Sequence, residues 1–112
     1  MKEIDTVLKA FADINRLRII KLLQKKRMCV CELAFILGIA QPSVSRHLKK
    51  LRSAGIIQFE QEGLYANYYL HPANEYAEEI LKHIETWMSN ESVVMKDTEK
   101  MKKADRQKLC QK

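Results

Sequence analysis

Two thiols, Cys29 and Cys31, stand one residue apart just before an apolar segment, and they are the side chains best suited to chemistry. A thiolate binds soft metal and metalloid ions, and it also oxidises readily. The chain contains three cysteines and no segment that resembles a secretory signal, so we do not expect a structural disulfide framework. Free or metal-bound thiolates are the favoured interpretation, and the third cysteine, Cys110, lies close to the C-terminus.

The composition favours a small binding domain over an enzyme. A chain of 112 residues, 46% of them hydrophobic, builds a modest core and leaves little room for a catalytic cleft. No nucleophile paired with a base and no phosphate-binding glycine loop is visible, so we expect no enzymatic activity. The net charge of +6 favours a polyanionic partner. Because no run of about 18 apolar residues is present, we expect a cytoplasmic protein without a membrane span.

Helical patterns surround the two thiols. Apolar residues recur at helical spacing in one segment and, after a break, in a second segment that Asn15 is expected to cap. The first set is Ile4, Val7, Leu8 and Phe11, and the second is Ile14, Leu17, Ile20 and Leu23. Beyond the thiols, Leu33, Ile36 and Leu37 predict a short third helix that Gly38 ends.

A fourth helix is predicted from Gln41 to about Ser53, with Pro42 in its first turn. Three apolar side chains must face the core, which leaves a short polar and basic face exposed. Such a face suits a helix that enters the major groove of DNA, although an ordinary solvated face is the alternative from this pattern alone. The inward residues are Val44, Leu48 and Leu51, and the predicted DNA contacts are Gln41, Ser43, Ser45, Arg46, His47, Lys49 and Lys50.

The segment after the fourth helix predicts a β-hairpin. Strand-forming residues occupy 56–60 and 65–70, and a turn that contains Gly63 separates them. A hairpin that directly follows two helices joined by a tight turn is typical of a winged helix-turn-helix domain. We therefore expect a mainly α fold with a small β-hairpin, in the order α-α-α-α-β-β-α.

The helix around residues 73–88 carries an apolar stripe that is broader than a small core requires. The stripe consists of Tyr76, Ala77, Ile80, Leu81, Ile84, Trp87 and Met88. Together with the N-terminal helix it predicts a homodimer, which would present two recognition helices to a two-fold symmetric DNA site; closure of the monomer core is the alternative. We expect a DNA-binding and dimerisation domain at 1–90 and a lysine-rich tail at 91–112, either helical or disordered.

Four stretches together resemble the ArsR/SmtB family of winged-helix metal-sensing repressors. They are residues 12–20, the box Cys29-Val30-Cys31-Glu32-Leu33, residues 41–48 and the hairpin end at 69–70, within about residues 4–88. The resemblance implies a homodimer that needs no cofactor to bind operator DNA and that releases the DNA when a metal or metalloid ion binds. The arsenic-responsive branch is the most similar one, which implies trivalent arsenic, As(III), as the inducer.

The thiol box departs from the arsenic-responsive branch at one position. The third box cysteine of that branch corresponds to Ala34 here, whereas As(III), a soft thiophilic centre, prefers three thiolates. The resemblance thus implies only Cys29 and Cys31 as ligands. Our candidates for the third are Cys110 of either subunit, a small-molecule thiol or hydroxide. Cadmium, lead or zinc is the alternative inducer, but the cysteine-bearing N-terminal extension of the cadmium-sensing branch is absent.

Other interpretations stay open. Glu79 and His83 resemble part of a metal site in other branches, without its full ligand set. The thiols are alternatively sensors of oxidation, for which peroxide rather than a metal would release DNA. A protein-binding role for the winged domain predicts negligible affinity for duplex DNA and little salt dependence.

The position of the thiols also predicts a switch. The N-terminus of a helix lowers the pKa of a thiol and so favours the thiolate. Residues i and i+2 point about 200° apart on a regular helix, so Cys29 and Cys31 cannot share an ion unless the helix start unwinds or bends. Because only residues 38–40 separate this helix from the recognition helix, we expect the distortion to reposition the recognition helix.

Overall fold

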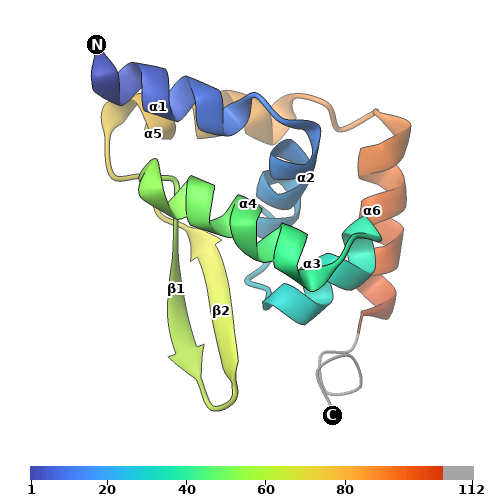
Figure 1. The fold of residues 1–112 in the computed structure, drawn as a ribbon. Helices are drawn as coiled ribbons and strands as arrows, with labels where there is room; N and C mark the ends of the chain where they lie inside the picture. The colour runs from blue at the N-terminus through green and yellow to red at the C-terminus, as the bar shows by residue number, and fades with distance from the viewer. Residues whose placement is uncertain (105–112) are drawn as a thin grey trace.

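Six helices and one β-hairpin make up residues 1–104, the part of the chain that the computed structural model describes (Figure 1). They are α1 (Lys2–Phe11), α2 (Ile14–Leu23), α3 (Val30–Leu37), α4 (Gln41–Ser53), β1 (Ile57–Glu62), β2 (Tyr65–Leu70), α5 (Glu75–Thr86) and α6 (Ser92–Lys103). The predicted winged helix-turn-helix order is confirmed through α5. Residues 92–103 are helical, which is one of the two states expected for the tail. The domain boundary at residue 90 stays a prediction.

The helix ends follow local chemistry with one correction. Asp13, not Asn15, caps α2, because its extended backbone lets the carboxylate accept a hydrogen bond from the Arg16 amide at 3.0 Å. Asn15 already lies inside the helix. Helix α3 ends as predicted at Gly38, whose φ of 70° is a left-handed conformation that glycine adopts without strain. Two further residues then lead into α4.

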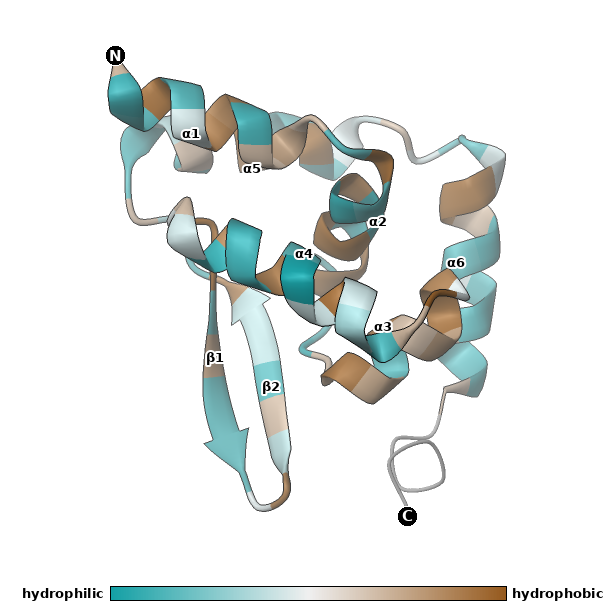
Figure 2. Cartoon of the chain, in the orientation of Figure 1, coloured by the Kyte–Doolittle hydropathy of each residue, from teal (hydrophilic) through white to brown (hydrophobic). Residues whose placement is uncertain are grey.

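The hydrophobic core lies where α2, α3 and α4 meet. The three predicted inward residues of α4, Val44, Leu48 and Leu51, are all buried, as are Ile20 of α2 and Leu33 of α3. Figure 2 shows α3 mostly in brown, whereas α4 alternates between teal and brown along its length. One side of α4 therefore belongs to the core and the other is free for a partner. Within residues 1–104, no helix is both long and apolar enough to cross a membrane.

The hairpin of β1 and β2 projects from the helices as a wing (Figure 1). Its antiparallel register runs from Ile57 opposite Leu70 to Glu62 opposite Tyr65. Met28 adds to this sheet, because its amide and carbonyl pair with those of Tyr68 at 3.3 and 2.8 Å. The residue that precedes Cys29 is thus fixed to the wing, a connection that the sequence did not predict.

A buried lysine fastens α5 to α2. The Lys21 Nζ atom donates to the carbonyl oxygens of Ile84 and Glu85 at 3.0 and 3.2 Å, and to Ser89 Oγ at 3.2 Å. The two carbonyls belong to the last turn of α5, where the helix dipole favours a cation, and Ser89 follows the helix. Burial lowers the pKa of Lys21, so the carbonyl contacts help to offset the cost of burying its charge.

Helix α6 packs against α2 and α3, and an ion pair between the partly buried Arg18 and the buried Asp97 holds it there. Arg18 of α2 donates to both carboxylate oxygens of Asp97, each at 2.9 Å, and the hydrogen-bonded carboxylate raises the pKa of Arg18. The same guanidinium donates to the Leu37 carbonyl at 3.3 Å, at the end of α3. Arg18 therefore joins α2, the last turn of α3 and α6.

Replacement of Asp97 by Asn tests how far α6 depends on this pair. We expect Asp97→Asn to lower the free energy of unfolding by roughly 3 kcal/mol, because it leaves the partly buried guanidinium of Arg18 without its counter-charge. Urea denaturation measures the change. Glu99→Gln is the matched control, because Glu99 forms an exposed pair with Lys102 at 3.2 Å, and its loss should cost less than about 1 kcal/mol. Equal effects of the two substitutions would contradict the assignment.

Candidate nucleic-acid interface and thiol site

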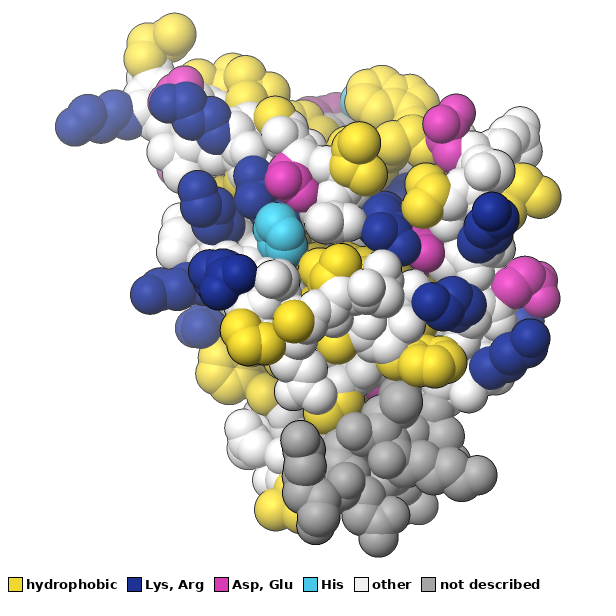
Figure 3. Space-filling model, turned by 45° about the vertical axis from the view of Figure 1, so that its right-hand side comes forward, with side chains coloured by type: hydrophobic (Ala, Val, Ile, Leu, Met, Phe, Trp, Pro, Cys, Tyr) yellow, Lys and Arg dark blue, Asp and Glu magenta, His cyan; other side chains and the backbone are white. Residues whose placement is uncertain are grey.

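The predicted DNA-contact residues lie on α4 outside the three core positions. Gln41, Ser45, Arg46, Lys49 and Lys50 are exposed, whereas Ser43 and His47 are half-buried. Arg46 Nη2 donates to Ser43 Oγ at 3.0 Å, which positions the guanidinium over the first turn of the helix. Figure 3 shows dark blue lysine and arginine side chains gathered around a cyan histidine. The arrangement provides hydroxyl and cationic groups for bases and phosphates, and DNA contact by these residues stays a prediction.

His47 is held differently from its neighbours on α4. The Arg16 Nη1 atom lies 3.2 Å from His47 Nδ1, and because arginine only donates, this ring nitrogen must accept and therefore carry no proton. Burial lowers the pKa of His47; the charges of Arg16, Arg46 and Lys50 lower it further, and Asp13 alone opposes them. His47 is therefore neutral, and its contact with Arg16 links α2 to the recognition helix.

Arg52 connects the recognition helix to the wing. Its guanidinium lies 4.5 Å from the centre of the Phe59 ring in β1, a cation–π contact that fixes the end of α4 against the hairpin. Arg27 makes a similar contact with Tyr69 of β2 at 4.1 Å. Sequence spacing gives no signal for either contact, because each joins residues from different elements.

Cys29 is the cap residue of α3, and its side chain is buried, with 3% of its surface exposed. Its backbone is extended, so only Cys31 belongs to the helix and the two thiols do not stand at positions i and i+2 of one regular turn. The Cys29 amide donates to Glu32 Oε1 at 3.0 Å, and the Glu32 amide donates back to the sulfur. This reciprocal pair fixes the helix start.

The predicted lowering of the thiol pKa is wrong for Cys29. Burial raises the pKa of this thiol, and the nearby Glu32 carboxylate raises it further, while hydrogen bonds from the amides of Glu32 and Cys31 only partly compensate. Desolvation therefore outweighs the helix N-terminus, whose effect is small next to the loss of water around a charged sulfur.

Cys31 contacts the recognition helix directly. Gln41 Nε2, on the first residue of α4, donates to Cys31 Sγ at 3.5 Å. The sequence assigned Gln41 to DNA and Cys31 to ligand binding, and it gave no sign that the two side chains meet. The thiol site and the candidate DNA interface are therefore contiguous.

A third ligand is not present among the described residues. Ala34 is buried in α3, and residues 1–104 contain no group of three or more histidine, cysteine or acidic side chains that would hold a metal ion. His83 instead stacks on Trp87 with 5.3 Å between ring centres, and Glu79 pairs with Lys82 at 3.6 Å. Cys110, the predicted third ligand, lies outside the described residues.

The end of α6 nevertheless lies close to the thiol box. Ala104 lines an open cavity of about 640 Å³ together with Glu32, which follows Cys31 in the chain. Lys26 of the same cavity forms an ion pair with Glu32 at 3.7 Å. The last described residue is therefore across one cavity from the turn that carries Cys29 and Cys31.

Comparisons with known proteins agree with this geometry. Residues 13–58 match the model of a family described as "Bacterial regulatory protein, arsR family". The arsenic resistance transcriptional regulator ArsR1 of Pseudomonas putida is 36% identical over 83% of this chain and 80% of its own length. The arsenical resistance operon repressor of Escherichia coli is 40% identical over 57% of this chain and 56% of its own length.

Solved structures give the same picture. The homodimeric winged helix-turn-helix DNA-binding domain Mb0332 of Mycobacterium bovis superposes with a TM-score of 0.66 and 26% identity, covering 75% of this chain and 76% of that domain. HlyU from Vibrio cholerae superposes with a TM-score of 0.69 and 25% identity, covering 80% of this chain and 95% of its own.

The neutral state of His47 predicts a pH dependence of stability. Its folded pKa lies below its unfolded one, so below about pH 6.5 the unfolded chain binds a proton that the folded chain excludes. The free energy of unfolding should therefore decrease as the pH falls from 7.5 to 5.5. In His47→Gln, which keeps an acceptor for Arg16 but does not titrate, urea denaturation should show a smaller decrease. An identical decrease in both proteins would contradict the role of His47.

Proposed function

The chain belongs to the ArsR family of winged-helix transcriptional repressors, and from this premise we propose that As(III), bound by the thiolates of Cys29 and Cys31, releases it from operator DNA. The family consists of DNA-binding regulators rather than enzymes. The names of two relatives, from Pseudomonas putida and Escherichia coli, refer to arsenic resistance, which supports the choice of inducer. Since a bacterial DNA-binding repressor meets its operator in the cytoplasm, we further infer that the protein works there.

The contact between Cys31 and Gln41 is the observation that carries this proposal. The sulfur that would bind the inducer accepts a hydrogen bond from the first residue of the recognition helix. A sulfur that shares its electron pairs with a soft ion can no longer accept this bond in the same way. Ligand binding at Cys31 would thus be felt at α4 without any long-range relay.

The donor set of this chain fits a soft thiophilic ion better than a hard one. Two cysteines form the box, and the neighbouring carboxylate, Glu32, is already committed to the Cys29 amide and to Lys26. Because burial raises the pKa of Cys29, this thiol must lose its proton when a ligand binds. Inducer affinity should accordingly increase with pH.

We assign the third thiolate to Cys110 of the same chain. Ala104 shares a cavity with Glu32 beside the thiol box, and Cys110 follows Ala104 by six positions. A segment of that length spans at most about 20 Å. The ion pair of Arg18 with Asp97 keeps α6 against α3, so the start of this segment stays close to its target.

Two connections would carry the change in the thiol box to the DNA-binding surface. Cys31 contacts Gln41 at the start of α4, and Met28, which precedes Cys29, is paired with Tyr68 in the wing. A movement of the box therefore affects both elements that a winged domain presents to DNA. Release requires that the ion bind the DNA-free conformation more tightly than the bound one.

A titration of the DNA complex tests the proposal. The probe is a labelled duplex selected from random sequence for binding to the native protein, and fluorescence anisotropy follows its release by arsenite. We expect arsenite to release DNA from the native protein, and Cys31→Ser to bind DNA as before but to lose the response. Release of DNA from Cys31→Ser at the native arsenite concentration would refute the proposal.

Further variants separate the parts of this mechanism. Cys110→Ser should need at least tenfold more arsenite, because two thiolates hold As(III) less well than three. Gln41→Ala should still bind arsenite and release DNA less completely. Cadmium, lead, zinc and peroxide are tested in parallel, and a response to one of them with none to arsenite would replace As(III) as the inducer.

The chain is expected to act as a homodimer, as the similar Mycobacterium domain does, and we place the interface on α1 and α5. These helices pack against each other, and large apolar side chains are exposed on or beside them: Leu8 of α1 at 51% and Trp87, which directly follows α5, at 53%. Figure 3 shows hydrophobic side chains along the upper edge of the molecule, where α1 and α5 lie. Exposure of this kind is costly unless a partner covers it.

Sedimentation velocity of Leu8→Glu tests this interface. We expect the variant to shift toward the monomer, with a dimer dissociation constant at least tenfold higher, because a carboxylate would be buried without a partner. Leu64→Glu is the control, since Leu64 is 95% exposed at the tip of the wing, away from α1 and α5. If Leu8→Glu stays dimeric at the concentrations at which the native protein is dimeric, the interface does not include Leu8.

A further inference from the structure

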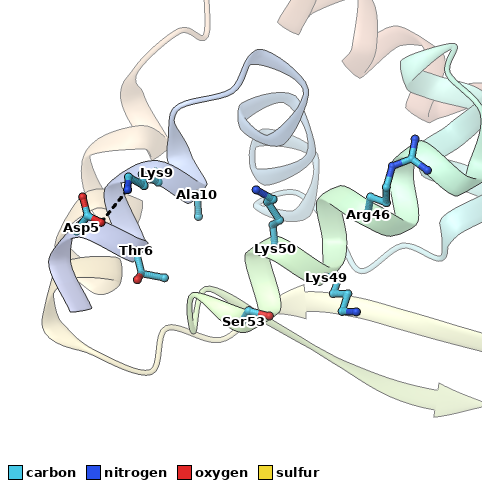
Figure 4. A pocket seen from close by; sticks show the side chains of 8 residues that line it. All are labelled: Asp5, Thr6, Lys9, Ala10, Arg46, Lys49, Lys50 and Ser53. Carbon is cyan, nitrogen blue, oxygen red and sulfur yellow. Dashed lines mark ion pairs between the residues drawn. The ribbon is translucent and has the colours of Figure 1, made fainter. Parts of the chain in front are cut away.

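A groove between α1 and the recognition helix adds Lys9 to three cations that the sequence had already grouped on α4. It has a volume of about 540 Å³ and is shown from close by in Figure 4. Its cationic lining consists of Lys9 from α1 and Arg46, Lys49 and Lys50 from α4; Thr6, Ala10 and Ser53 add neutral surface, and Asp5 is its one acidic lining residue. Four cations against one carboxylate make this groove a site for an anion.

We propose that this groove binds the phosphodiester backbone of duplex DNA beside the recognition helix, and that Lys9 is the contact residue supplied by α1. The proposal adds to the repressor function a DNA contact outside the helix-turn-helix and the wing. It rests on the binding of duplex DNA by this domain.

The position of the groove follows from the dimensions of helix and duplex. An α-helix with its side chains is about 10–12 Å wide, close to the roughly 12 Å width of the major groove. When α4 lies in the major groove, the sugar-phosphate backbone therefore passes along its flank. On one flank this space is the groove, and Lys9 forms its opposite wall (Figure 4).

The two walls are held at a fixed separation. Arg16 donates from Nε to the Ala10 carbonyl at 2.7 Å and from Nη2 to the Lys9 carbonyl at 3.2 Å, while its Nη1 contacts His47 of α4 at 3.2 Å. One guanidinium thus ties the last turn of α1 to the middle of the recognition helix. The groove is consequently a preformed feature, and a phosphate that enters it need not order its walls.

Asp5 determines how strongly Lys9 attracts a DNA phosphate. Its carboxylate lies 3.0 Å from Lys9 Nζ, and both side chains are largely exposed. An exposed pair of this kind is weak, so a phosphate readily takes the place of the carboxylate. Asp5 nevertheless competes for Lys9 and places a negative charge near the bound backbone. Removal of this charge should therefore strengthen DNA binding, whereas removal of Lys9 should weaken it.

The experiment measures duplex affinity by fluorescence anisotropy between 50 and 200 mM KCl, concentrations at which phosphate contacts dominate the salt dependence. The probes are the selected duplex and a random-sequence duplex of about 30 base pairs. The variants are Lys9→Gln, Asp5→Asn and the control Lys82→Gln. Lys82 is matched to Lys9, because it is an exposed helical lysine paired with an acid four residues earlier, Glu78, at 3.7 Å.

We expect Lys9→Gln to weaken binding to both duplexes by a similar factor and to reduce the steepness of log K against log salt by about 0.9. Asp5→Asn should tighten binding to both, and Lys82→Gln should behave as the native protein. A salt slope in Lys9→Gln equal to that of Lys82→Gln, or a loss confined to one duplex sequence, would overturn the proposal. Native protein that bound neither duplex would instead count against the repressor function itself.

Discussion

The burial of one row of apolar side chains on α4 controls the rest of this molecule. Val44, Leu48 and Leu51 are almost completely inaccessible, and each contributes roughly 1.5–3 kcal/mol through the removal of apolar surface from water. A rotation of α4 about its axis would expose these side chains and carry Arg46 or Lys50 toward the core, where an unpaired charge is costly. The helix is therefore fixed in rotation, and so is the direction in which its polar face and its groove with α1 point.

The thiol box lies where α3, α4 and the wing meet. Gly38 ends α3 just before α4 begins, Gln41 reaches back to Cys31, and Met28 continues the sheet of the wing. Arg18 adds a fourth connection, since it joins the last turn of α3 to α6. Because these links are short, α3 cannot move alone, and a change at its first turn is transmitted to its neighbours.

Sequence periodicity predicts the helices, because their apolar residues recur at regular spacing. It does not predict contacts between residues that are far apart in the sequence. The apolar spacing of 3.6 residues predicted α1 to α5, and Gly38 and Pro42 marked two helix ends correctly. Helix α6 gave a weak pattern because it buries a charged residue, Asp97, whose partner lies 79 positions away. The raised pKa of Cys29 escaped prediction for the same reason, since burial depends on residues distant in sequence.

The strengths of the contacts also limit how the switch works. Reversal of a two-state equilibrium from 99:1 to 1:99 requires about 5.5 kcal/mol, whereas one neutral hydrogen bond contributes only about 0.5–1.5 kcal/mol. The contact of Gln41 with Cys31, at 3.5 Å and exposed, is therefore too weak to reverse DNA binding alone. Coupling of the required size needs the wing pairing at Met28, the turn at Gly38 and the Arg18 connection to change together. Two thiol boxes in a dimer double the free energy available, so a symmetric assembly suits a switch built from weak contacts.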